Sequence, residues 1–224
     1  VERSRGLGDV YKRQGRPWGL LKWAMSLDGR TALPSGASQW ISGPQARQWV
    51  HQLRSLCDAV IVGGGTVRAD DPLLTSRGRR TPEPLRVVLS RSLDLPTSSQ
   101  LWDTSVAPTL VAFGPDAADR TLPAGIEPLD LEVCDPLHLM GALAARGCNR
   151  VLWECGPELA AAALRQGCIQ ELSAVVAPKL MGGLAARTPL AELGFERMDQ
   201  VTALEMLRSE PLGTDWLIQG RLLD

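Results

Sequence analysis

Hydrophobic and polar residues alternate along this chain in blocks that suit strands and amphipathic helices. Short apolar runs recur after a polar start, and several lead into stretches in which apolar residues repeat at i, i+3, i+4 and i+7. The clearest helical stretch begins at Pro44 and ends near Cys57, and its apolar stripe is Ala46, Trp49, Val50 and Leu53. The pattern predicts helices at 44–57, 136–146 and 157–166, and strands at 19–26, 59–62, 85–89, 109–113, 150–153, 172–177, 201–208 and 214–222.

The order of these elements indicates the fold class. Strands that alternate with helices are typical of an α/β protein, in which a mostly parallel sheet carries helices on both faces. The last two strands have no helix between them, so we expect an antiparallel pair at the sheet edge. No internal repeat or break in composition divides the chain after residue 16. The sequence therefore predicts one domain at 16–224, preceded at 1–15 by a non-native or linker-like tail without periodicity.

Composition narrows the classes of partner and compartment. With 24 Lys and Arg against 25 Asp and Glu, the net charge of -1 provides no basic field for a nucleic acid. No apolar run approaches the roughly 20 residues of a membrane span. The five cysteines are irregularly spaced and the only histidines are His51 and His138, so we expect no metal site. Unpaired thiols favour a cytoplasmic protein.

Three loops after predicted strands carry the candidate chemistry, because ligands of α/β sheets bind beyond the carboxyl ends of parallel strands. Residues 63–66 (GGGT) allow positive φ and close approach to a phosphate, although a tight strand-to-helix turn would use the same glycines. Gly156 stands at a helix N-terminus that suits a pyrophosphate, and Glu154 precedes it as a ligand or an ordinary helix-start carboxylate. The loop at 26–42 contributes Trp40, which suits a planar or amphipathic ligand.

Several basic residues add to these loops. Lys22 lies within an apolar strand and must reach solvent, a carboxylate or a ligand, because an unpaired buried ammonium is very costly. Lys179 is a weaker case of the same kind. Arg47, His51 and Arg54 follow one helix face opposite the apolar stripe, a pattern typical of a solvated surface.

Several short motifs occur in the order and spacing of a known family. They include KWAMSLDGRTA at 22–32, SQWISGPQAR at 38–47, DAVIVGGGTVRADDP at 58–72, WECGP at 153–157 and APKLMG at 177–182. Together they resemble the reductase domain of bacterial riboflavin biosynthesis deaminase/reductases, and the likeness covers essentially the whole chain from residue 16. One departure is Ser90, which stands where the family commonly has an aspartate, in a turn where the resemblance implies a cofactor contact.

The resemblance implies a dihydrofolate-reductase-like fold and NADPH-dependent reduction of 5-amino-6-(5-phosphoribosylamino)uracil to 5-amino-6-(5-phosphoribitylamino)uracil. By motif match, contacts to this phosphorylated pyrimidine fall on Ser38, Arg54, Leu74, Arg77 and Glu154. Cofactor contacts fall on Ala24, Trp40, Thr66, Asp70, Gly156 and Pro157. The arginines and the serine suit a phosphate, and the glutamate suits pyrimidine N–H groups. The catalytic proton donor is left open between Lys22 and Asp70.

Two other functions remain as alternatives. One is a dihydrofolate-reductase-like enzyme with another substrate, which the Ser38, Arg54 and Arg77 set disfavours because a pterin has no phosphate for them to bind. The other is a non-catalytic nucleotide-binding module of the same fold. The histidine and cysteine pattern of a zinc deaminase is absent from these residues, so reduction is the one activity expected of them. The apolar C-terminal strands favour a symmetric homodimer.

Overall fold

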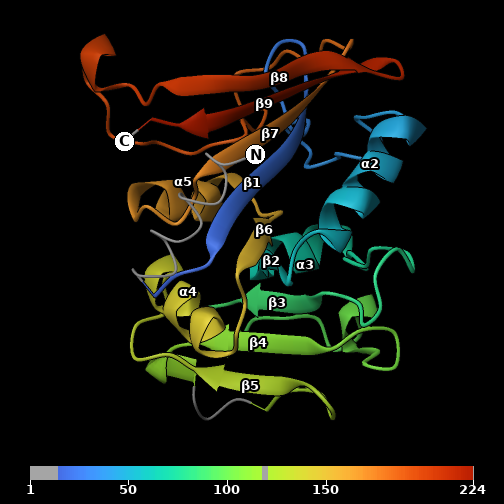
Figure 1. Cartoon of the computed structure of the whole chain (residues 1–224), viewed down its shortest axis with the longest axis vertical. Helices are drawn as coiled ribbons and strands as arrows, with labels where there is room; N and C mark the ends of the chain where they lie inside the picture. The colour runs from blue at the N-terminus through green and yellow to red at the C-terminus, as the bar shows by residue number, and fades with distance from the viewer. Residues whose placement is uncertain (1–14, 118–120, 224) are drawn as a thin grey trace, which may run out of the picture.

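The computed structural model describes residues 15–117 and 121–223, and within them it forms one nine-stranded sheet (Figure 1). The strand order is β5-β4-β3-β2-β6-β1-β7-β9-β8. Neighbouring strands are parallel except for the β7–β9 and β8–β9 pairs. The predicted mixed sheet with an antiparallel C-terminal edge is therefore confirmed. The strands are β1 (Trp18–Ser26), β2 (Ala59–Gly63), β3 (Leu85–Leu89), β4 (Thr109–Phe113), β5 (Glu127–Asp130), β6 (Arg150–Trp153), β7 (Glu171–Ala177), β8 (Leu204–Leu212) and β9 (Asp215–Leu222).

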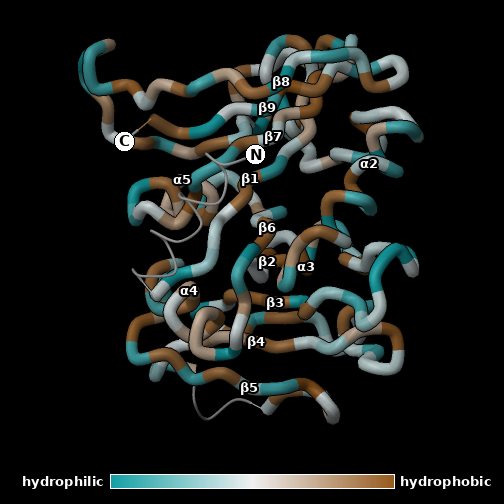
Figure 2. Tube along the Cα trace, in the orientation of Figure 1, coloured by the Kyte–Doolittle hydropathy of each residue, from teal (hydrophilic) through white to brown (hydrophobic). Residues whose placement is uncertain are grey.

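Helices cover both faces of the sheet, because neighbouring residues of the central strands point to opposite sides. On one face Leu21, Ile61 and Val151 pack with α4 and α5, while on the other Leu20, Val60 and Leu152 pack with α2 and α3. This two-sided burial explains the continuous apolar runs of β2 to β4, whose hydrophobic colouring is visible in Figure 2. None of the helices in the described part of the chain is long and apolar enough to cross a membrane. The helices are α2 (Pro44–Ser55), α3 (Gly64–Asp70), α4 (Pro136–Ala145) and α5 (Pro157–Arg165), with 3-10 turns at Gln100–Trp102, Pro115–Ala117 and Met198–Gln200.

Three elements differ from the sequence prediction. The short edge strand β5 was missed because its sequence, EPLD, lacks apolar alternation and its residues are largely exposed. The strand predicted at 201–208 is β8, which begins and ends later, at Leu204 and Leu212. It continues through Pro211 because β8 is an edge strand, where a proline is tolerated. The helix α3 was also missed. The tail predicted at 1–15 lies, apart from Gly15, outside the described residues.

Two glycines should respond to alanine with opposite signs. Gly213 joins β8 to β9 in a two-residue turn with φ +68, where a Cβ is strained, so Gly213→Ala is expected to cost about 1 kcal/mol. Gly141 lies in the exposed middle of α4 with no atom near its Cβ position, so Gly141→Ala should stabilise by about 0.5–1 kcal/mol. Urea unfolding of the two variants measures both changes. Equal effects would contradict this account of the turn.

Candidate active site

The site is assembled where the parallel strands β2 and β6 end beside the middle of β1. In the sheet β6 lies between β2 and β1, and Trp153 pairs with both Ile61 and Leu21. The residue after β6 is Glu154, whose main-chain N–H donates to the carbonyl of Ile61 over 2.9 Å. The next residue on β1 is Lys22. Strand register alone therefore brings Lys22 and Glu154 side by side, although they are far apart in the sequence.

Glu154 is the centre of a buried ion cluster. Its carboxylate accepts two hydrogen bonds from Arg54, from Nε over 2.6 Å and from Nη2 over 3.0 Å. Lys22 Nζ lies 3.8 Å from the second carboxylate oxygen. The side chains of Lys22, Arg54 and Glu154 are only 16%, 13% and 10% exposed. The expectation that Lys22 must reach a carboxylate, solvent or a ligand is resolved in favour of a carboxylate.

Burial and charge shift the titration of this cluster. Burial alone would raise the pKa of the Glu154 carboxyl, but the Arg54 and Lys22 cations oppose it and hold that pKa at about 2. Burial lowers the pKa of Lys22 below its ordinary 10.5; Glu154 opposes this change and Arg54 adds to it. Two cations share one carboxylate, so Lys22 is the member whose proton is held least tightly.

The helix α2 does not carry the solvated polar face that its pattern suggested. Arg54 is buried against Glu154 and also donates from Nη1 to the carbonyl of Thr75 over 3.1 Å. His51 Nδ1 lies 3.4 Å from the same carbonyl. Arg47 lies over the indole of Trp40, 4.6 Å from the ring centroid. The expectation was wrong for Arg54, whose side chain is largely covered by tertiary partners, whereas Arg47 and His51 remain half-buried.

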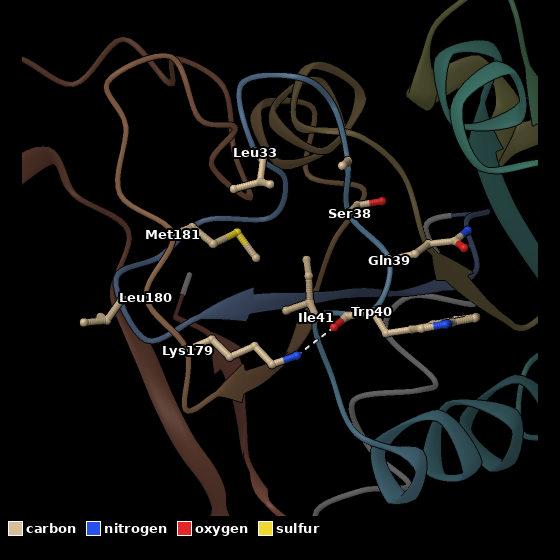
Figure 3. A pocket seen from close by; sticks show the side chains of 9 residues that line it. Leu33, Ser38, Gln39, Trp40, Ile41, Lys179, Leu180 and Met181 are labelled. Carbon is tan, nitrogen blue, oxygen red and sulfur yellow. Dashed lines mark hydrogen bonds between the residues drawn. The ribbon is translucent and has the colours of Figure 1, made fainter.

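Trp40 stands beside a cavity of about 380 Å³ between the loop after β1 and the loop after β7 (Figure 3). Lys179 Nζ donates to the Trp40 carbonyl over 2.7 Å, while the indole points away from Met181. Trp40 remains 65% exposed, so its ring is available to a ligand. The cavity is lined by Leu33, Ala37, Ser38, Gln39, Trp40, Ile41, Lys179, Leu180 and Met181.

Asp28 fastens these two loops together. Its carboxylate accepts hydrogen bonds from the main-chain N–H groups of Met181 over 3.1 Å and Gly182 over 2.7 Å, and from the Ser26 hydroxyl over 2.6 Å. The Ser26 bond and the two main-chain bonds lower the pKa of Asp28 to about 2. The sequence showed Asp28 only as a turn residue, and its partner loop could not be read from its spacing.

The glycine-rich loops meet, but their backbone differs from the expectation. Gly63, Gly64 and Gly65 do not adopt positive φ; Gly63 caps α3, and the triplet makes the strand-to-helix turn that was the alternative. Gly64 is required because a Cβ there would lie 2.9 Å from the Ser90 hydroxyl. The Cβ position of Gly156 lies 4.0 Å from Thr66 Oγ1, so the starts of α3 and α5 adjoin.

The remaining expected site residues are placed as follows. The Ser38 hydroxyl donates to Asp70 over 3.3 Å, which joins a candidate substrate residue to a candidate cofactor residue. Leu74 has φ +57 and is only 2% exposed, so its side chain belongs to the core and its main chain alone can meet a ligand. Arg77 is exposed on the same loop. Ala24 is half-buried on β1, and Pro157 is the first residue of α5.

Comparison with known proteins agrees with this architecture. Residues 17–218 match the family described as the RibD C-terminal domain. The chain is 50% identical to the riboflavin biosynthesis protein RibD of Synechocystis over 211 residues, which cover 92% of this chain and 57% of that protein. The chain therefore spans less than two thirds of this relative.

Solved structures give the same result. A Thermotoga maritima structure described as a diaminohydroxyphosphoribosylaminopyrimidine deaminase/5-amino-6-(5-phosphoribosylamino)uracil reductase has a TM-score of 0.83 at 25% identity, with 94% of this chain and 58% of that chain covered. Dihydrofolate reductase from Enterococcus faecalis has a TM-score of 0.50 at 13% identity, with 94% of this chain and 98% of that chain covered, which shows a shared fold. With the sheet topology and the site described above, these matches show that the chain belongs to the RibD C-terminal domain family.

Proposed function

We propose that this chain reduces 5-amino-6-(5-phosphoribosylamino)uracil to 5-amino-6-(5-phosphoribitylamino)uracil with NADPH. The observation that carries the proposal is the buried cluster of Lys22, Arg54 and Glu154 beside the start of α5. It sets a carboxylate for pyrimidine N–H groups next to an ammonium that can give up a proton. The Thermotoga structure described as a reductase of this substrate supports the same reaction.

The residues around the two glycine loops fit a nicotinamide dinucleotide. Gly156 caps α5 without a side chain, so its helix N-terminus presents main-chain N–H groups to an anion such as a pyrophosphate. Thr66 and the half-exposed strand residue Ala24 offer a hydroxyl and a small surface, and the open Trp40 ring can stack. When bound, the cofactor supplies a hydride to C1 of the opened ribose. Asp70, which accepts a hydrogen bond from Ser38, would complete the cofactor site.

Lys22 is our choice as the proton donor. Opening of the ribose ring leaves its oxygen in need of a proton, and a donor must reach it from a largely dry site. The Lys22 ammonium has three N–H bonds and a lowered pKa. Asp70 is exposed and accepts a hydrogen bond from Ser38, which suits a positioning role better than proton donation.

Arg77→Ala should separate substrate binding from cofactor binding. Arg77 is exposed and follows Thr75, whose carbonyl accepts a hydrogen bond from Arg54, by two residues. Because a guanidinium suits a phosphate, loss of Arg77 is expected to raise KM for the phosphorylated substrate about 10- to 100-fold while KM for NADPH changes little. Steady-state kinetics with each substrate varied measures the split. Arg146→Ala, at the exposed Arg146–Glu127 pair, is the matched control. Equal losses for both substrates would contradict the assignment.

One assay tests the function as a whole. The protein is incubated with NADPH and the phosphoribosylamino pyrimidine, and oxidation is followed by the absorbance of the nicotinamide; NADH is tested in parallel. We expect turnover that requires the pyrimidine. Turnover with dihydrofolate instead would show a different substrate, and nucleotide binding without any turnover would favour a non-catalytic module.

We further propose that two copies of the chain pair through β8. This strand is the sheet edge, and its exposed side chains include Leu204, Met206 and Leu207. A second copy would cover them. Light scattering after size exclusion should give twice the mass of one chain, and a monomeric mass would reject the pairing. All five cysteines are free, which supports a reducing compartment such as the cytoplasm.

A further inference from the structure

His51 lies among three arginines on the rim of the candidate site. Its Nδ1 is 3.4 Å from the carbonyl of Thr75, which also accepts a hydrogen bond from Arg54. The chain continues from Thr75 to Arg77 and Arg79 on the same loop, and the charges of all three arginines act on the imidazole. His51 and the loop therefore face each other across a small, strongly basic area.

The charges in this area are unequally matched. Arg54 is neutralised by its paired hydrogen bonds to Glu154, whose charge also interacts with His51. Arg77 and Arg79 are exposed, and within residues 15–117 and 121–223 neither forms an ion pair or hydrogen bond. The nearby carboxylate of Glu83 is occupied by the main-chain N–H groups of Ser76 and Gly78. Two cations beside His51 thus lack a counter-charge of their own.

These surroundings disfavour the charged form of the ring. Burial lowers the pKa of His51 and the charge of Arg54 lowers it further; the Thr75 carbonyl opposes this, and the charges of Arg77 and Arg79 add smaller decreases. A doubly negative group bound between Arg77 and Arg79 would cancel the repulsion that keeps the proton away. The imidazolium ring would then donate to the same anionic group, as a third residue beside the two arginines.

We propose that His51, with Arg77 and Arg79, binds the phosphate group of the substrate, and that His51 takes up one proton from solvent when the phosphate binds. The inference rests on the function proposed above and extends it, because it assigns two further residues to the phosphate. In this arrangement Arg54 does not bind the phosphate, and its two hydrogen bonds keep the Glu154 carboxylate in place for the pyrimidine. Recognition of the phosphate then depends on pH through a side chain that takes no part in the reduction.

Nuclear magnetic resonance can read this proton directly, because the chain has only two histidines. His138 is the internal reference, since it lies on α4 and its Nδ1 is paired with Asp135 over 2.8 Å. The rings are titrated from pH 5 to 9 in sodium sulfate, in ribose 5-phosphate and in sodium chloride at equal ionic strength. Sulfate is included because it stays doubly negative throughout.

We expect sulfate and ribose 5-phosphate to raise the His51 pKa by about one unit or more relative to chloride, with His138 unmoved. A His51 titration that is the same in all three salts would overturn the proposal. Equal shifts of both histidines would also overturn it, because they would report general screening. This measurement needs no turnover, so it stays informative even if the proposed reaction fails.

A kinetic test uses His51→Gln, with His138→Gln as the control. For His51→Gln we expect KM for the phosphorylated pyrimidine to rise about tenfold at pH 6 and less than about threefold at pH 8, with kcat unchanged. The increase in KM is larger at pH 6 because the imidazole of the wild-type complex is charged at low pH and neutral at high pH, and glutamine replaces only the contribution of the neutral ring. A variant that loses stability but keeps the wild-type KM at both pH values would show a merely structural histidine and reject the proposal.

Discussion

Glu154→Gln is expected to lower the free energy of unfolding at neutral pH by about 3–5 kcal/mol. The change keeps the size of the side chain but removes the one negative charge that Arg54 and Lys22 share. Both cations are largely buried, so neither regains full hydration when the carboxylate is lost. Lys22 can relieve part of this cost by releasing its proton, whereas an arginine cannot.

The loss should shrink in acid. The pKa of Glu154 falls from 4.5 to about 2 on folding, so its ionisation contributes stability above pH 4.5 that is lost as the pH falls from 4.5 towards 2. As the pH approaches 2, the Glu154 carboxyl of the wild-type protein becomes neutral, and the wild type then resembles the glutamine variant. The decrease of the Glu154 pKa from 4.5 to about 2 corresponds to about 3 kcal/mol of stability.

Urea unfolding at pH 7, 5, 4 and 3 tests both statements. Glu127→Gln is the control, because Glu127 is 52% exposed in its pair with Arg146 and should contribute less than about 1 kcal/mol. A difference between wild type and Glu154→Gln that stays constant over this pH range would show that the buried carboxylate is not the source of the stability.

Lys22→Met is expected to lower kcat about 100- to 1,000-fold while the protein stays folded and binds cofactor normally. Methionine fills the space of the lysine stem, and Glu154 keeps its two hydrogen bonds from Arg54. The loss therefore reports the ammonium and not the ion cluster as a whole. Single-turnover kinetics with saturating substrates measures the chemical step.

The pH profile identifies the donor. Because the pKa of Lys22 is lowered below 10.5, wild-type kcat should fall as the pH rises through that lowered value, and this limb should vanish in Lys22→Met. Asp70→Asn is the comparison and should cost less than about tenfold, since Asp70 is exposed. A larger loss for Asp70→Asn than for Lys22→Met would assign the proton to Asp70 instead.

The local pattern of the chain was sufficient for much of the fold. The strands β2, β3, β4 and β6 are buried on both faces, which makes them continuous apolar runs that are easily found. Pro44, Pro136 and Pro157 begin helices as their preference predicts. The edge strand β5 and the short helix α3 escaped, because neither has an apolar period long enough to detect.

The candidate site shows the same division. The sequence by itself determined which residue types stand after each strand, and it required a partner for Lys22 because a buried ammonium without one is too costly. Only the tertiary structure decided that the partner is Glu154, that Arg54 is shared with it, and that Trp40 rests on Arg47. The two contacts of Glu154 depend on strand order and on how α2 lies against the sheet, and they join segments a hundred or more residues apart. Local spacing carries no information about such contacts, because they form only when the sheet brings its carboxyl ends together.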